Sequence, residues 1–151
     1  MNKNKIVVTG GHGRFGTVLK LFHKKQNIYY PKKKILNILK ITSIESYLKK
    51  IKPKYLIHCA GLSRPMNIHD TEISKSIDIN IIGTANIVKM CSKFKIKLIY
   101  FSTGYVYQGK TGNYKETDPV FPINNYAWSK LGGECAVTMY KNSLILRITM
   151  C

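Results

Sequence analysis

The chain has 151 residues, 44% of them hydrophobic and 21% charged, and its 25 Lys and Arg against 7 Asp and Glu give a formal charge of +18. This length suits one domain with its own core, and the hydrophobic share excludes a disordered polyelectrolyte. No apolar run reaches the roughly 18 residues of a membrane helix, and residues 1–5 lead into a strand-like run rather than a signal peptide, so we expect a cytoplasmic protein with no membrane partner.

The positive charge comes almost entirely from lysine, since Arg14, Arg64 and Arg147 are the three arginines. Arginine is the residue that makes bidentate contacts with phosphates and bases. A chain so poor in it favours AT-rich coding as the origin of the charge over a specific nucleic-acid partner. A nucleic-acid-binding module remains an alternative.

The cysteines show no paired spacing such as C-x-x-C. This pattern indicates reduced structural thiols, and it favours neither a metal site nor a disulfide framework. The four residues are Cys59, Cys91, Cys135 and Cys151.

Short β-branched runs alternate with amphipathic segments along the chain. We expect strands at residues 5–9, 28–30, 55–59, 97–101 and 143–148, and helices at residues 14–25, 43–52, 71–94 and 125–140. Apolar residues at helical spacing predict buried faces on two of these helices: Phe15, Val18, Leu19 and Phe22 on the first, and Ile73, Ile77, Ile81 and Val88 on the third. The alternation predicts an α/β fold, a Rossmann-like doubly wound parallel sheet covered on both faces. Residues 1–151 would form one domain that stops after its fifth strand.

A glycine-rich turn follows the first strand. Residues 9–16 read T-G-G-H-G-R-F-G, which fits T-G-x-x-G-x-x-G between a strand and a helix. Glycines at this spacing allow a tight turn and bring backbone N–H groups close to a pyrophosphate at the helix N-terminus. A purely structural turn would need only one or two of them. The placement therefore predicts nucleotide binding.

A tyrosine and a lysine lie four residues apart on the fourth predicted helix, as Tyr126 and Lys130. Residues at this spacing share one helix face, so the phenol and the ammonium can point into the same cleft. A nearby ammonium would lower the pKa of the phenol towards the range of acid–base catalysis. The alternative is a surface tyrosine beside a solvated lysine. Ser102 and Thr103, at the end of the fourth strand, could add hydroxyls that bind a substrate oxygen, or they could belong to an ordinary polar turn.

Together these motifs resemble the extended short-chain dehydrogenase/reductase superfamily, most closely its dTDP-4-dehydrorhamnose reductase group. Further segments carry the likeness over nearly the whole chain: L-N-I at 36–38, K-P-K at 52–54, H-C-A-G at 58–61, N-I-I-G-T-A-N at 80–86, S-T-G-Y-V-Y at 102–107, Y-K-E-T-D at 114–118, P-I-N-N-Y at 122–126 and L-R-I-T at 146–149. The resemblance implies an NAD(P)-binding domain that reduces a 4-keto-6-deoxy nucleotide sugar, as in deoxysugar biosynthesis.

The resemblance also implies roles for individual residues. Thr103, Tyr126 and Lys130 match the catalytic residues: Tyr126 would protonate the substrate carbonyl, Thr103 would position it, and Lys130 would lower the pKa of Tyr126 and hold the nicotinamide ribose. Tyr126 and Lys130 would also bind the cofactor. The remaining cofactor-binding positions fall in three turns: Gly10, Gly13, Arg14, Phe15 and Gly16; Asn37 and Ile38; and Ala60, Gly61 and Leu62.

Three departures from the group leave alternatives open. Gly104 stands where the group has an aspartate. Asn37 replaces a second aspartate, and the lysines at 32–34 follow the second strand, which favours NADPH over NADH. The C-terminal substrate lobe of the group has no counterpart here. A non-catalytic relative, a cofactor-binding regulatory subunit, and an epimerase or dehydratase are therefore alternatives. A homodimer, or a partner that supplies the lobe, is also open.

Overall fold

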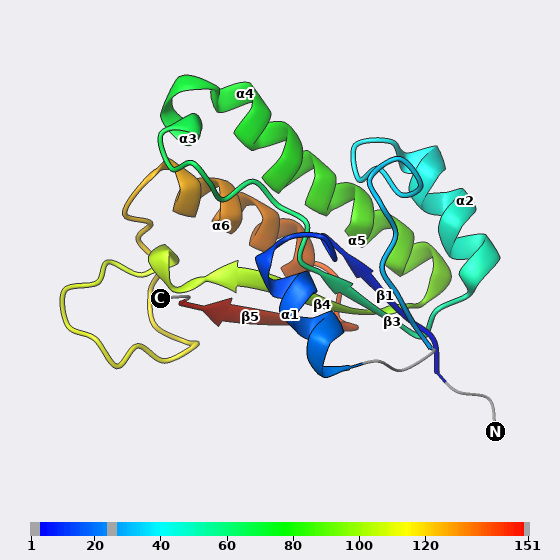
Figure 1. The fold of residues 1–151 in the computed structure, drawn as a ribbon. Coiled ribbons are helices and arrows are strands. Elements are labelled where there is room, and N and C mark those ends of the chain that lie inside the picture. The colour runs from blue at the N-terminus through cyan, green and yellow to red at the C-terminus, as the bar shows by residue number, and fades with distance from the viewer. Residues whose placement is uncertain (1–3, 24–26, 150–151) are drawn as a thin grey trace.

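The structure is a computed structural model that describes residues 4–23 and 27–149 (Figure 1). Five parallel strands form one sheet in the order β2-β1-β3-β4-β5. Their bounds are β1 Ile6–Thr9, β2 Ile28–Tyr29, β3 Tyr55–His58, β4 Lys97–Thr103 and β5 Ser143–Ile148. All five predicted strands are present, and the Rossmann-like fold class is confirmed. Cys151 and residues 24–25 of the first predicted helix lie outside the described residues.

The helices are α1 Arg14–Phe22, α2 Ile41–Ile51, α3 Ile68–Thr71, α4 Ile73–Ser76, α5 Gly83–Phe94 and α6 Asn125–Thr138. A π-helical segment, η1 Ile77–Ile82, joins α4 to α5, and a 3₁₀ turn, η2 Gly104–Val106, follows β4. The single helix expected at residues 71–94 is therefore present as a continuous helical run over residues 73–94, with a π-helical segment in its middle. None of the helices in the described residues is both long and apolar enough to cross a membrane.

The core lies between the sheet and one layer of helices. Figure 1 shows α2, α5 and α6 on one face of the sheet and α1 on the opposite face. Leu56, Leu98 and Tyr100 from the strands pack against this layer. Its apolar contributions are Ile44 and Leu48 from α2, Ile87, Met90 and Cys91 from α5, and Val137 from α6.

The two predicted buried faces are confirmed only in part. On α1, Phe15 and Leu19 are partly buried, and the Phe15 ring centroid lies 4.4 Å from that of Phe101 on β4, but Val18 is 50% and Phe22 is 78% exposed because this helix lies alone on its side of the described sheet. On the third predicted helix, Ile81 and Val88 are partly buried, whereas Ile73 and Ile77 are exposed. Helical periodicity predicts an apolar face but does not say what covers it.

The strand register places the predicted motifs together at the carboxyl ends of the strands. Thr9 pairs with His58, and His58 with Tyr100, so β1, β3 and β4 end side by side. Ligands of open α/β sheets bind beyond these carboxyl ends. The glycine-rich turn, the turn after β3 and the hydroxyl groups after β4 all lie there.

Candidate functional site

The glycine-rich turn is tightly folded against the turn after β3. Gly10 has φ +69°, and a Cβ atom on it would lie 2.5 Å from the backbone nitrogen of Ala60. A Cβ atom on Gly16 would lie 2.3 Å from Cα of Gly11, so the first turn of α1 packs directly on the loop. Both positions therefore require glycine, one for its conformation and both for the close approach of backbone.

The N-terminus of α1 is left open by this turn. Gly13 occupies the N-cap position and has no side chain with which to cap the helix, and its own N–H donates to the Gly10 carbonyl at 2.9 Å. The first helical turn contains no acidic residue. Unpaired N–H groups at a helix N-terminus attract anions, so this end of α1 can hold a phosphate group.

A cavity of about 330 Å³ opens beside the turn. This volume is at the lower end of the range of small-molecule sites. Fifteen residues line it: Thr9, Gly10, Gly11, His12, Gly13, Pro31, Lys33, Leu36, Asn37, Ile38, Leu39, Cys59, Ala60, Gly61 and Ile79. A glycine cradle, an open helix end and a largely apolar recess are what a dinucleotide needs, so the residues present fit such a cofactor.

The cavity brings together six of the predicted cofactor-binding residues: Gly10, Gly13, Asn37, Ile38, Ala60 and Gly61. The other predicted positions, Arg14, Phe15, Gly16, Leu62, Tyr126 and Lys130, lie outside its lining. Apart from Lys33, the other residues that line the cavity are not among the predicted cofactor contacts. Of the run Lys32–Lys34, only Lys33 lines the cavity. His12 lay within the quoted glycine motif but was not predicted to bind.

Asn80 holds the turn after β3 in place. Its side-chain oxygen accepts from Leu62 N at 2.7 Å, and its amide nitrogen donates to the Leu62 carbonyl at 2.9 Å and to Ser129 Oγ at 2.8 Å. Asn80 lies in η1, and Ser129 lies in α6. This single buried side chain therefore links a predicted cofactor-binding turn to the helix that carries Tyr126 and Lys130.

His58 is a second buried side chain that holds a turn of the site in place, and the sequence did not predict this role. It is fully buried, with Nδ1 2.7 Å from Thr9 Oγ1 and Nε2 3.2 Å from Thr84 Oγ1. Burial, together with the positive charge of Lys130, lowers the pKa of His58 to about 3. A neutral imidazole thus ties the start of the glycine-rich turn to α5.

The three predicted catalytic residues come from two elements. Thr103 ends β4 and is nearly buried, and its Oγ1 accepts from Tyr105 N at 3.2 Å. Tyr126 is the second residue of α6, which Asn124 caps by accepting from Ala127 N at 2.8 Å. The Thr103 side chain lies close enough to the Tyr126 phenol to lower its pKa. The structure thereby places the predicted proton donor against the predicted positioning hydroxyl.

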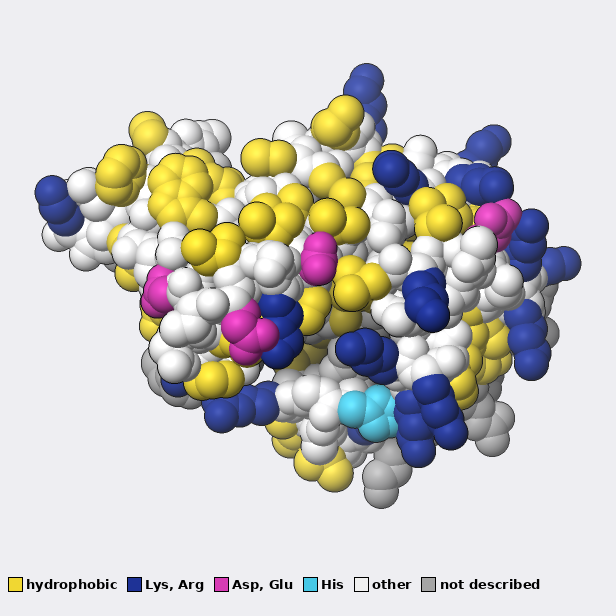
Figure 2. All heavy atoms as spheres, turned by 90° about the horizontal axis from the view of Figure 1, so that it is seen from above, with side chains coloured by type: hydrophobic (Ala, Val, Ile, Leu, Met, Phe, Trp, Pro, Cys, Tyr) yellow, Lys and Arg dark blue, Asp and Glu magenta, His cyan; other side chains and the backbone are white. Residues whose placement is uncertain are grey.

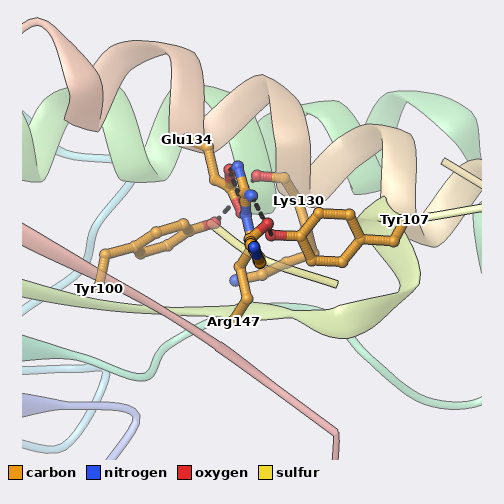
Figure 3. Close-up of polar contacts among 6 residues, drawn as sticks. Tyr100, Tyr107, Lys130, Glu134 and Arg147 are labelled. Carbon is orange, nitrogen blue, oxygen red and sulfur yellow. Dashed lines mark hydrogen bonds and ion pairs between the residues drawn. The ribbon is translucent and has the colours of Figure 1, made fainter. Parts of the chain in front are cut away.

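Lys130 lies one helical turn after Tyr126 and is 6% exposed (Figure 3). Its Nζ donates to the Phe101 carbonyl at 2.7 Å and lies 4.2 Å from the ring centroid of Tyr100. Nζ is also 3.8 Å from where a Cβ atom of Gly61 would be, so it adjoins the cofactor cavity. Burial lowers the pKa of Lys130 to about 7, although the Glu134 carboxylate opposes this shift.

The expected lowering of the Tyr126 pKa by Lys130 is absent from this arrangement. Burial raises the pKa of Tyr126, while the nearby Thr103 side chain and the charge of Arg64 act in the opposite direction. The ammonium of Lys130 is engaged with the Phe101 carbonyl and the Tyr100 ring instead. Arg64, from the segment after β3, is the cation that acts on the phenol.

The described residues contain no group of three or more His, Cys, Asp or Glu side chains that could hold a metal ion. The three cysteines that the structure describes, Cys59, Cys91 and Cys135, are free thiols. The site thus consists of the cavity beside the glycine-rich turn and a Thr–Tyr–Lys group near the carboxyl ends of the strands. Such a group can donate a proton to an oxygen beside a bound cofactor.

Comparison with known proteins gives consistent results. The sequence model of the family described as RmlD substrate binding domain matches residues 4–151. The methionine adenosyltransferase 2 subunit beta of Xenopus laevis is 29% identical over 95% of this chain and 46% of its own length. The dTDP-4-dehydrorhamnose reductase of Aggregatibacter actinomycetemcomitans is 28% identical over 95% of this chain and 50% of its own length.

A solved structure shows the same architecture. The dTDP-4-dehydrorhamnose reductase of Bacillus anthracis in complex with NADP superimposes with a TM-score of 0.89 and 30% identity, over 97% of this chain and 54% of that one. The chain therefore spans about half the length of the relatives it matches.

Proposed function

Because the chain belongs to the RmlD substrate binding domain family, we propose that it binds NADPH or NADH and serves in the reduction of a 4-keto-6-deoxy nucleotide sugar. The observation that carries the proposal is the position of Tyr126, at the start of α6, beside Thr103, at the end of β4, where the carboxyl ends of the strands also hold the glycine cradle. The NADP in the similar reductase from Bacillus anthracis supports the choice of cofactor.

In this mechanism the bound cofactor supplies the hydride. The N-terminus of α1 holds the pyrophosphate through the backbone N–H groups of Arg14, Phe15 and Gly16. Thr103 orients the substrate carbonyl, and Tyr126 donates its phenolic proton to the carbonyl oxygen as negative charge develops there. The positive charge of Arg64, which lowers the pKa of Tyr126, stabilises the phenolate that remains, and Asn80 links the Leu62 turn to α6, the helix that carries Tyr126.

The test follows NADPH absorbance with dTDP- or UDP-linked 4-keto-6-deoxyhexoses, for the wild type and for Tyr126→Phe. Removing the general acid is expected to lower turnover by about 100-fold or more and to leave cofactor affinity unchanged. Tyr55→Phe is the matched control, because Tyr55 is the first residue of β3 and lies at the amino ends of the strands, away from the site at their carboxyl ends. Equal turnover in wild type and Tyr126→Phe would contradict the proposed role of Tyr126.

A second candidate is a cofactor-binding subunit without turnover. Two observations favour it: six relatives that match 88–95% of the chain are named methionine adenosyltransferase 2 subunit beta, and Gly104 lacks the carboxylate of the reductase group. The Thr149 hydroxyl fills the space beside Gly104, 2.5 Å from where a Cβ atom would lie. NADPH binding with no oxidation by any tested sugar supports this candidate.

Two finer points belong to the same proposal. An epimerase or dehydratase on this scaffold would convert the sugar without net consumption of NADPH, which product analysis detects. The lobe that surrounds the sugar would come from further polypeptide, on this chain or on a partner. We also place the protein in the cytoplasm, which the free thiols at Cys59, Cys91 and Cys135 support.

A further inference from the structure

The ring of Tyr126 contacts two other aromatic side chains. The imidazole of His69 lies with its ring centroid 5.1 Å from that of Tyr126 at an interplanar angle of 54°, and the ring of Tyr105 on η2 lies 6.4 Å away at 90°. Tilted and edge-to-face pairs at these separations attract each other, because the positive edge of one ring approaches the negative face of the other. The proposed proton donor is therefore held through its ring as well as by its position beside Thr103.

A hydrogen bond to Ser76 fixes the orientation of His69. Nδ1 of His69 lies 2.7 Å from Oγ of Ser76, and the two residues are 1% and 3% exposed. They belong to consecutive short helices, α3 and α4, in the segment after β3. The neighbouring Asp70 accepts a hydrogen bond from the Asn125 side chain at 2.7 Å, which ties α3 to the start of α6. The imidazole is thus locked in one place against the helix that carries Tyr126.

The second ring nitrogen of His69 has no hydrogen-bond partner among the described residues. This atom, Nε2, is buried out of reach of bulk water. Buried polar atoms of folded proteins are nearly always paired, so an unpaired one needs an explanation. When the Ser76 hydroxyl donates to Nδ1, the proton of the neutral imidazole lies on Nε2. The Tyr126 ring packs against this imidazole, and the π face of a ring can accept a weak hydrogen bond from an N–H group.

Burial favours the neutral form of His69. It lowers the pKa of His69 below its usual value, while the charge of Asp70 opposes this shift. Figure 2 shows most of the visible Lys and Arg side chains on the helical side gathered towards the α2 end, away from α3. Around the phenol itself, burial and Tyr105 raise the pKa of Tyr126, and the charge of Arg64 lowers it. A neutral His69 adds no charge to this set, so it acts on the phenol through the direction of its N–H group.

We propose that His69 is a positioning residue that directs its Nε2–H at the Tyr126 ring and thereby stabilises the phenolate that forms when Tyr126 gives up its proton. This role rests on the proposed function, in which the O–H bond of Tyr126 breaks and the proton joins the substrate carbonyl oxygen as hydride reaches the carbon. Loss of the proton adds negative charge to the ring, so the N–H contact becomes stronger as the reaction proceeds. The Ser76 hydroxyl contributes by keeping the imidazole proton on Nε2.

The ionisation of the phenol at position 126 can be measured without substrate or cofactor. A difluorotyrosine at this position titrates at lower pH than tyrosine, and its fluorine NMR signal reports one residue among the ten tyrosines of the chain. His69→Phe keeps an aromatic ring against Tyr126 but has no N–H group. We expect this variant to lower the acid ionisation constant of the phenol by about threefold, the size of effect that a weak N–H···π contact gives. His23→Phe is the matched control and should leave the constant unchanged, because His23 is exposed at the C-cap of α1.

A second variant covers the case in which His69→Phe fails to fold, as judged by circular dichroism. Ser76→Ala leaves the imidazole in place but no longer holds its proton on Nε2, so it should shift the ionisation constant in the same direction. An unchanged constant in folded His69→Phe, or in Ser76→Ala where His69→Phe does not fold, shows that His69 only packs against Tyr126 and overturns the proposal.

Turnover of a nucleotide sugar gives a separate measurement. His69→Phe should lower kcat by about threefold and leave KM unchanged, because the contact strengthens only as the phenolate forms. A fall in kcat that His23→Phe reproduces would overturn the role of His69. Absence of turnover in the wild type would contradict the proposed function alone, since the titration of the phenol does not depend on turnover.

Discussion

Arg147 on β5 donates three hydrogen bonds to the carboxylate of Glu134 on α6 (Figure 3). Its Nε lies 3.2 Å from both carboxylate oxygens, and its Nη2 lies 2.8 Å from Oε2. The remaining Nη1 donates to the Tyr107 hydroxyl at 2.6 Å, and that hydroxyl donates to the Lys115 carbonyl at 3.0 Å. The pair therefore joins the edge strand, the helix of the site and the loop that follows η2.

Arg147→Met is expected to lower the free energy of unfolding by about 3–5 kcal/mol, because Glu134 is 3% exposed and would keep a buried, uncompensated charge. Urea denaturation measures the loss. The double variant Arg147→Met with Glu134→Gln is the control, and it should recover much of the stability because no charge is left unpaired. A double variant as unstable as the single one would show that packing, rather than charge, is the source of the loss.

Gly10→Ala should abolish nucleotide binding and destabilise the fold. The substitution meets two penalties, a positive φ and a Cβ atom 2.5 Å from Ala60 N. Gly109→Ala is the matched control, since Gly109 has φ +77° and nothing within 4 Å of its added Cβ atom. The control should cost only the conformational penalty of about 1–2 kcal/mol and should leave NADPH affinity unchanged.

Thermal unfolding and NADPH titration of both glycine variants separate the two penalties. If Gly10→Ala and Gly109→Ala lose equal stability and both bind NADPH as the wild type does, the tight contact with Ala60 has no functional role.

The positions of the strands and the glycine-rich turn follow from local sequence. Residues 6–9 and 97–103 are nearly continuous apolar or β-branched runs, and such runs have few alternatives to a buried parallel strand. Gly10 has a positive φ, and Gly10 and Gly16 both allow a close approach of backbone that other residues cannot provide. These features depend on residues that are close together in the sequence, so one sequence is enough to predict them.

Features that depend on distant partners could not be predicted in this way. The exposure of Phe22 and Ile77 depends on which elements cover them. The pKa of Tyr126 depends on burial and on Arg64, which lies 62 positions earlier in the sequence. Asn80 and His58 act through hydrogen bonds to residues far along the chain, and a resemblance in their motifs did not disclose those bonds.

The free energy of unfolding should rise between about pH 7 and pH 8.5, and the titration of Lys130 should cause much of this rise. Burial lowers the pKa of Lys130 to about 7 in the folded chain, whereas an unfolded lysine keeps its proton to about pH 10.4. The unfolded state then binds one proton more than the folded state, which adds up to about 1.4 kcal/mol of stability per pH unit. Above this window Cys59 and Cys91, whose thiol pKa values burial raises to about 12, act in the opposite direction.

The free energy of unfolding in urea, measured across this window, tests the role of Lys130. Lys130→Met should flatten the pH dependence, because methionine binds no proton. Lys75→Met is the control for loss of an exposed lysine and should keep the wild-type slope. A Lys130→Met variant that keeps the wild-type slope would contradict the lowering of the Lys130 pKa to about 7.

The cofactor preference should depend on Lys33. Of the three consecutive lysines after β2, Lys33 alone lines the cavity, next to Asn37, which takes the place of a carboxylate that would repel a 2′-phosphate. Lys33→Glu is expected to raise the Kd for NADPH by about tenfold or more and to change that for NADH little, because NADH has no 2′-phosphate. Lys34→Glu makes the same change of charge at an exposed position outside the cavity, so it should affect both cofactors weakly.

Fluorescence titration of both cofactors at two salt concentrations provides the measurement. Equal losses for NADPH and NADH in Lys33→Glu, or an equal effect of Lys34→Glu, would show that the general positive field acts here rather than a 2′-phosphate contact.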